Sequence, residues 1–133
     1  MRGSKANYTQ RIRRHRFMRL VRTALRDLPS GIRFMLDNVE VVVVDEPSSA
    51  DLDDSGTETL EDVFGLYQGI PLTERGSDYS MVLPDKITIF RGPLERAFTS
   101  PLDIAEQVRI TVVHEMAHHF GIDEDRLDEL GYA

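Results

Sequence analysis

The stretch His114-Glu115-Met116-Ala117-His118 decides most of what this sequence predicts, for the fold as well as for the chemistry. Two histidines four residues apart lie on one face of an α-helix, so both imidazoles can bind the same metal ion. Zinc in a catalytic site takes three protein ligands and keeps one position for water, whose pKa falls to roughly 7. Glu115 stands between the histidines and is the natural base for that water's proton. The stretch therefore predicts a zinc site with its own proton acceptor.

The surrounding residues predict one amphipathic helix from about Pro101 to about Phe120. Ser100 is placed to cap this helix, Pro101 suits the first helical position, and Asp103 is placed to complete a capping box. The apolar stripe recurs near the 3.6-residue period at Ile104, Ala105, Val108, Val112, Met116 and Ala117. One side of the helix is therefore expected to pack while an adjacent strip presents the histidines.

A turn after this helix is expected to bring a third ligand towards the metal. Gly121 can end the helix in a left-handed conformation at no side-chain cost. Asp123, Glu124 and Asp125 follow, and a carboxylate is a suitable zinc ligand. Glu124 is the preferred candidate because it stands six residues after His118, where zinc peptidases with a compact His-Glu-x-x-His-x-x-Gly-x-x-ligand arrangement place their last ligand. Asp123 and Asp125 stay open as alternatives.

The same residues also have an interpretation without a metal. The helix would then be an ordinary surface helix with two solvated histidines, and the acidic run would be a solvated face or a helix N-terminus, which favours negative charge. His119 points about 100° away from His118 around the helix, so we expect it to pack or hydrogen-bond rather than to bind the metal.

Length and composition narrow the class of protein. At 133 residues and 41% hydrophobic content, the chain fits one modest domain with its own core. It has no cysteine, which removes disulfides, thiolate zinc sites and cysteine nucleophiles together. No apolar run predicts a membrane span and no apolar core predicts a secretory signal, so cytoplasmic residence is the expectation.

Charge is unevenly distributed along the chain. Residues 1–33 carry ten Lys or Arg and one acid, whereas the remainder carries six against twenty-two. We divide the chain into a basic N-terminal segment, residues 1–27, helical from about residue 9, and a main domain, residues 28–133. The basic segment is expected to be attracted to its own acidic domain. The basic segment has few aromatic residues among its arginines and matches none of the usual nucleic-acid-binding modules, which argues against a nucleic-acid role. A homodimer stays open as an oligomeric state.

Helical patterns come first, strands in the middle and the metal helix near the end, which predicts an α+β fold with a small mixed sheet packed on that helix. Strands are expected at Val39–Val44, at 64–68 and at Lys86–Phe90, and residues 46–60 are expected to form a surface loop. We hypothesise that Lys86–Phe90 offers an exposed edge to an extended peptide.

Three stretches of the sequence resemble the small bacterial zincin-like metallopeptidases called mini-zincins. They are His114–Tyr132, Leu66–Gly76 and Leu83–Arg91, and the resemblance covers about residues 28–133. It implies a minimal zincin fold with a short mixed sheet, and the apolar spacing of the first 36 residues adds N-terminal helices. The basic segment lies outside it.

The resemblance also implies roles for residues of the site. Zinc would be held by His114, His118 and an acidic residue, with Glu115 as general base and Tyr132 supporting the site. This chain departs from the family at the third ligand, where Glu124 replaces the typical Asp.

Three functions follow. The first is a zinc-dependent metallopeptidase that acts on a peptide or protein substrate. The alternative is a non-catalytic zincin-fold protein with a metal-binding or protein-interaction role. In the third, the basic N-terminal helix attaches the domain to nucleic acid or to another anionic partner.

Overall fold

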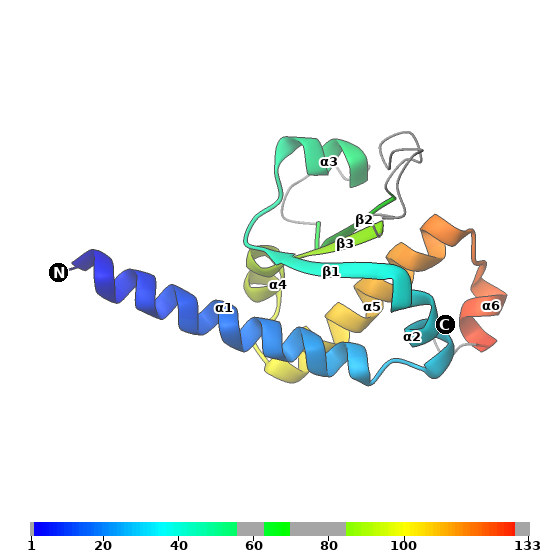
Figure 1. Ribbon diagram of the computed structural model, residues 1–133, viewed down its shortest axis with the longest axis horizontal. Coiled ribbons are helices and arrows are strands. Elements are labelled where there is room, and N and C mark those ends of the chain that lie inside the picture. Colours follow the sequence, from blue (N-terminus) through cyan, green and yellow to red (C-terminus); the bar gives the residue numbers. More distant parts are fainter. Residues whose placement is uncertain (1, 56–62, 70–84, 130–133) are drawn as a thin grey trace, which may run out of the picture.

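The computed structural model describes residues 2–55, 63–69 and 85–129, and the side chains of 7–53, 63–69 and 85–129. The elements, in chain order, are α1 (Arg2–Arg26), α2 (Ser30–Met35), the 3-10 turn η1 (Leu36–Asn38), β1 (Val39–Val44), α3 (Ser49–Ser55), β2 (Gly65–Gln68), β3 (Asp85–Phe90), α4 (Arg91–Ala97), α5 (Pro101–Phe120) and α6 (Glu124–Glu129). The expected α+β fold is confirmed, with a mixed sheet packed against helices (Figure 1). Among these helices none is long and apolar enough to cross a membrane.

The three described strands lie in the order β1-β3-β2, with β3 parallel to β1 and antiparallel to β2. The three predicted strands are therefore confirmed within a residue or two. The hypothesis that Lys86–Phe90 supplies an open edge is wrong, because β3 is the central strand and pairs with a neighbour on each side. β2 and β1 are the outer strands of the described sheet.

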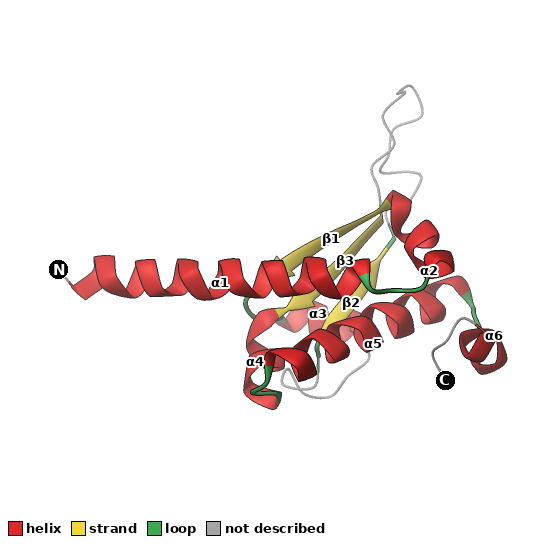
Figure 2. Cartoon of the chain, turned by 90° about the horizontal axis from the view of Figure 1, so that it is seen from below, coloured by secondary structure: helices red, strands yellow, loops and turns green. Residues whose placement is uncertain are grey.

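The main core lies between one face of the sheet and the helices α1 and α5 (Figure 2). The predicted stripe of α5 is confirmed, since Val108, Val112 and Met116 are almost completely buried. The second half of α1 contacts α5 and buries Phe17, Val21 and Ala24, and Leu28, just after the helix, is buried in the same core. A smaller apolar cluster on the other face contains Val63, Leu66 and Phe90, with Leu52 of α3 packed against it.

The helices α3 and α4 lie where no helix was expected from the sequence. Residues 46–60 are not loop throughout, because α3 forms there behind a reciprocal cap: Ser48 N–H donates to Asp51 Oδ2 at 2.8 Å, and Asp51 N–H donates to Ser48 Oγ at 3.2 Å. α4 follows β3 directly, with Pro93 in its first turn and Leu94 fully buried. α1 also begins at Arg2, earlier than residue 9.

Gly65 allows β2 to lie unusually close to α5. A Cβ at this position would stand 2.6 Å from Thr111 Cγ2 and 3.1 Å from the backbone oxygen of Thr88. Any side chain would therefore push β2 away from either α5 or β3. The sequence predicts a short strand here but gives no sign of this close contact.

We expect Gly65→Ala to destabilise the protein by about 1–3 kcal/mol, since the added methyl overpacks the contact between β2 and α5. Thermal unfolding followed by circular dichroism measures the loss. Adding Thr111→Ser, which removes the clashing methyl, should recover part of it. Gly31→Ala, at an exposed position of α2, is the matched control. Equal melting temperatures for Gly65→Ala and wild type would contradict the contact.

Asp45 ties three elements together where β1 ends. Its carboxylate accepts hydrogen bonds from Arg14 of α1 at 2.7 Å and from Arg91 of α4 at 3.0 Å. Its backbone oxygen accepts the Gly92 N–H at 2.8 Å. Hydrogen bonds from Arg91 and Arg14 hold the pKa of the Asp45 carboxyl below its ordinary value.

This lowered pKa predicts a pH-dependent contribution to stability. The folded state favours ionised Asp45, so its stabilisation is present at neutral pH and is lost as pH falls through the lowered pKa. Because the Asp45 side chain is 40% exposed and solvent screens its ion pairs, Asp45→Asn should cost at most about 1 kcal/mol at pH 7, and the gap in melting temperature should shrink towards pH 3. A gap that stays constant with pH would contradict the charged interaction. Asp128→Asn, at an exposed position of α6, is the control.

Candidate metal centre

α5 carries the predicted site residues and ends as the sequence predicts. Pro101 occupies its first turn, but no side-chain hydrogen bond caps it, so the expected capping box of Ser100 and Asp103 does not form. Water can take its place, because Leu102 and Asp103 in this first turn are exposed. At the other end Gly121 is left-handed, with φ 66° and ψ 32°, and its N–H donates to the Ala117 oxygen. This confirms the predicted sharp turn after His118.

His114, Glu115 and His118 differ in their surroundings although they share one turn of α5. Both histidines are exposed, whereas Glu115 is half-buried. The Tyr67 N–H of β2 donates a hydrogen bond to Glu115 Oε2 at 3.3 Å. Burial raises the pKa of Glu115, and the Tyr67 N–H and the two histidines oppose that rise. One carboxylate oxygen is thus held by the sheet beside two accessible imidazoles.

The acidic residues after the turn have separate positions. Asp123 caps α6, since its Oδ1 accepts the Arg126 N–H at 2.9 Å and its backbone oxygen accepts the Leu127 N–H at 3.0 Å. Glu124 and Asp125 form the first turn of α6 and are exposed. Within residues 2–55, 63–69 and 85–129, no three histidine or acidic side chains come close enough to hold one metal ion. Tyr132 lies outside the described residues.

These residues can be compared with the requirements of a zinc ion. Imidazole nitrogens are preferred zinc donors, and an ion can reach both His114 and His118 from solvent. Glu115 lies on the same turn of α5, and its side chain is only partly exposed to solvent. The described side chains therefore fit zinc at two of the three protein positions. They do not by themselves assemble the third.

A cluster of side chains next to the site was not predicted as a unit. The Tyr67 ring stacks on His119 with centroids 3.9 Å apart and meets the edge of Phe120. The Tyr67 hydroxyl donates to Asp85 Oδ2 at 2.8 Å, and His119 Nε2 lies 3.9 Å from the same oxygen. The expectation that His119 packs instead of joining the metal histidines agrees with this contact. The contacts of Tyr67 with His119 and Asp85 depend on the register of the sheet, which no local sequence pattern predicts.

A hollow of about 380 Å³ opens at this end of α5. It is lined by Phe34, Met35, Asp37, Asn38, Val39, Tyr67, Asp85 and Phe120. Phe34 is 82% exposed and Phe120 is 47% exposed, so apolar surface remains accessible here. Tyr67 connects this hollow with the candidate metal site, because it lines the hollow and its N–H donates to Glu115.

The family model for zincin-like metallopeptidases matches residues 36–132, so this chain belongs to that family. The match confirms the resemblance inferred from the sequence, and the α+β architecture is consistent with a zincin-like domain. No curated protein matches the chain. The family is described as metallopeptidases, and membership implies a metal and a peptide substrate.

The two neighbouring histidines should respond differently to substitution in chelator-treated protein. His119→Ala loses the ring stacked on Tyr67, so we expect a loss of about 0.5–1.5 kcal/mol in unfolding free energy. His118→Ala, at an exposed position one residue earlier, should have an unfolding free energy close to that of wild type. Chemical denaturation of both variants measures the two free energies. Equal destabilisation would contradict the distinct roles of these residues.

Proposed function

We propose that the chain is a zinc-dependent metallopeptidase whose zinc is held by His114, His118 and Glu124, with Glu115 as general base. One observation carries the proposal: a half-buried carboxylate, fixed by a backbone N–H of the sheet, lies between two exposed histidines on the same helix. Family membership supports it. Glu124 is preferred over Asp123 because Asp123 is already engaged in capping α6. Tyr132 is proposed to support the site.

Zinc bound there would supply Lewis acidity, which lowers the pKa of water and polarises a substrate carbonyl. Glu115 would accept the proton of the attacking water as the carbon–oxygen bond forms. It would then deliver that proton to the amide nitrogen as the carbon–nitrogen bond breaks. The Tyr67 N–H keeps one Glu115 oxygen occupied, so the other oxygen is the one assigned to proton transfer.

A peptide is the substrate that suits this surface. β2 is an outer strand of the described sheet and lies against α5, so an extended chain beside it would pass Glu115. The neighbouring hollow offers apolar side chains, Phe34 and Phe120, to a residue of that chain.

Glu115→Gln should lower peptide hydrolysis by about 10²–10⁴-fold, because the amide cannot accept the proton of water. The variant should keep its zinc, since the proposed ligands are unchanged. Hydrolysis of a fluorogenic peptide library, with zinc content measured on the same samples, tests both statements. Glu106→Gln, at an exposed position earlier on α5, is the matched control and should keep full activity. Wild-type rates in Glu115→Gln would sink the mechanism.

The second candidate function is a zincin-fold protein that binds a metal or a partner without catalysis. The observation in its favour is that the described side chains supply two zinc positions and not three. Wild-type protein that takes up zinc yet hydrolyses no peptide of the library would favour this function.

A further inference from the structure

The first half of α1 extends beyond the rest of the described structure. The second half is held on α5 by buried apolar residues, beginning with Phe17. Residues 2–16, which we call the basic arm, continue the same helix past the sheet and α4 (Figures 1 and 2). From residue 7 to residue 16 every side chain is exposed except that of Ile12, which is half-buried. The arm therefore offers most of its circumference to solvent.

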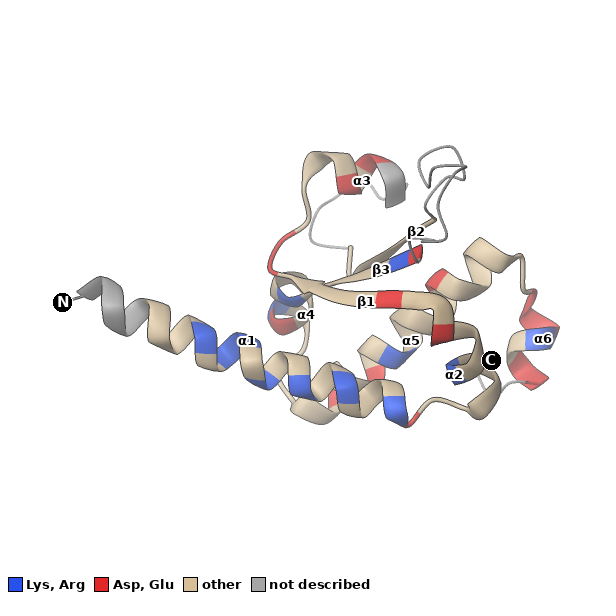
Figure 3. Cartoon of the chain, in the orientation of Figure 1, with Lys and Arg blue, Asp and Glu red and all other residues tan. Residues whose placement is uncertain are grey.

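Positive charge on α1 is largely uncompensated. The sequence of the helix contains eight arginines, one lysine and no acid. In Figure 3 the coloured part of α1 carries blue segments and no red one. Arg14 pairs with Asp45 at 2.7 Å. No other arginine of α1 whose side chain is described forms an ion pair with the described chain; these are Arg11, Arg13, Arg16, Arg19, Arg22 and Arg26. Among the described side chains, this segment forms one ion pair with its own domain, that of Arg14, and Gln10 accepts a hydrogen bond from Arg91 of α4 at 3.2 Å.

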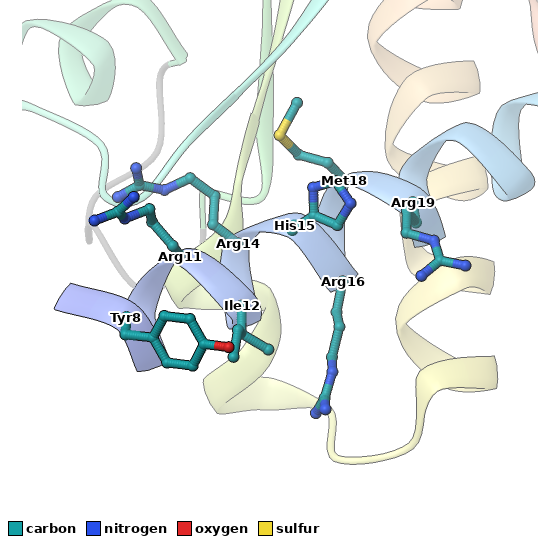
Figure 4. A pocket seen from close by; sticks show the side chains of 8 residues that line it. All are labelled: Tyr8, Arg11, Ile12, Arg14, His15, Arg16, Met18 and Arg19. Atoms are coloured by element: carbon teal, nitrogen blue, oxygen red, sulfur yellow. The ribbon is translucent and has the colours of Figure 1, made fainter. Parts of the chain in front are cut away.

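The side chains of the arm surround the helix with donors. Arg11 and Arg14 extend from one side and Arg16 from the opposite side, with Tyr8 and Ile12 between them (Figure 4). A hollow of about 490 Å³ runs along these side chains. The Tyr8 ring is 65% exposed. A chain of regularly spaced anions could therefore be met by guanidinium groups on both sides of one helix.

We propose that the basic arm binds the phosphodiester backbone of a nucleic acid. A guanidinium matches a phosphate with two parallel hydrogen bonds, and eight of the nine cations of α1 are arginines. Such binding depends on charge and not on base sequence. It needs little aromatic interleaving and no module of known type, which answers the sequence-based argument against nucleic acid. The acidic domain repels the same polyanion and confines contact to the arm.

Other occupants fit the arm less well. A membrane-surface helix needs a continuous apolar face, but the apolar residues Phe17, Val21 and Ala24 of α1 are buried in the core. The acidic domain of a second copy would complement the charge. Four arginines line the hollow beside Tyr8, Ile12 and Met18, and self-association through this surface is one of the outcomes that the test below distinguishes.

Fluorescence anisotropy of a labelled DNA duplex and of a labelled single-stranded RNA, titrated with the full chain at several salt concentrations, tests the proposal. The arm variant is Arg11→Gln/Arg16→Gln, which changes two exposed arginines of the arm that form no ion pair with the described residues. The matched control is Arg33→Gln/Arg126→Gln, which removes the same charge from exposed positions of α2 and α6. Glutamine and arginine have similar helix propensities, so circular dichroism should show that both variants remain folded.

We expect wild type to bind at least one probe, with affinity falling steeply as salt rises. The arm variant should bind about tenfold more weakly and lose up to about two units of salt slope, while the control changes less than about twofold. The stronger probe distinguishes a duplex from a single strand. The proposal is overturned if neither probe binds, or if both variants lose affinity equally. Two further measurements with the same variants are sedimentation with phosphatidylserine vesicles and the oligomeric state as a function of salt. The proposal is also overturned if the arm variant weakens only vesicle binding or only salt-sensitive self-association.

Discussion

The close contact between β2 and α5 is the constraint on which the candidate site depends. Gly65 lets the strand approach Thr111 of the helix, and the antiparallel register with β3 directs alternate N–H groups away from that neighbour. The Tyr67 N–H is one of these, and it meets Glu115. A carboxylate that would rotate freely on a surface helix is therefore held beside two histidines. The sheet positions this carboxylate through a backbone N–H group, not through a side chain.

Charge organises the molecule at a larger scale. Residues 1–33 are strongly basic and the remainder is strongly acidic. Asp45 connects the two by pairing with Arg14 and Arg91 at the point where β1 ends and α4 begins. Beyond this connection α1 continues without acidic partners among the described residues. One helix therefore has two distinct parts, a packed half that covers α5 and an arm whose charge is available to another molecule.

Features with a local cause were predictable from the sequence. The period of apolar residues places α5, the alternation of Lys86–Phe90 places β3, and Gly121 ends the metal helix as expected. Features that depend on strand register or on tertiary contacts could not be predicted from the sequence. Strand order decides that β3 is central, and only the packed structure brings Tyr67 to Glu115 and His119. The helix α3 was missed because its Ser48–Asp51 cap lies in a stretch whose composition favours loops.

The central claim is that His114, His118 and Glu124 hold one zinc ion, and metal content tests it most directly. Elemental analysis would compare freshly purified wild type with Glu124→Ala, and with Asp125→Ala as the neighbouring exposed acid. We predict about one equivalent of zinc in wild type and in Asp125→Ala, and sharply less in Glu124→Ala. Absence of zinc from wild type, even after supplementation, would contradict the metal centre. Full zinc in Glu124→Ala would contradict the third ligand.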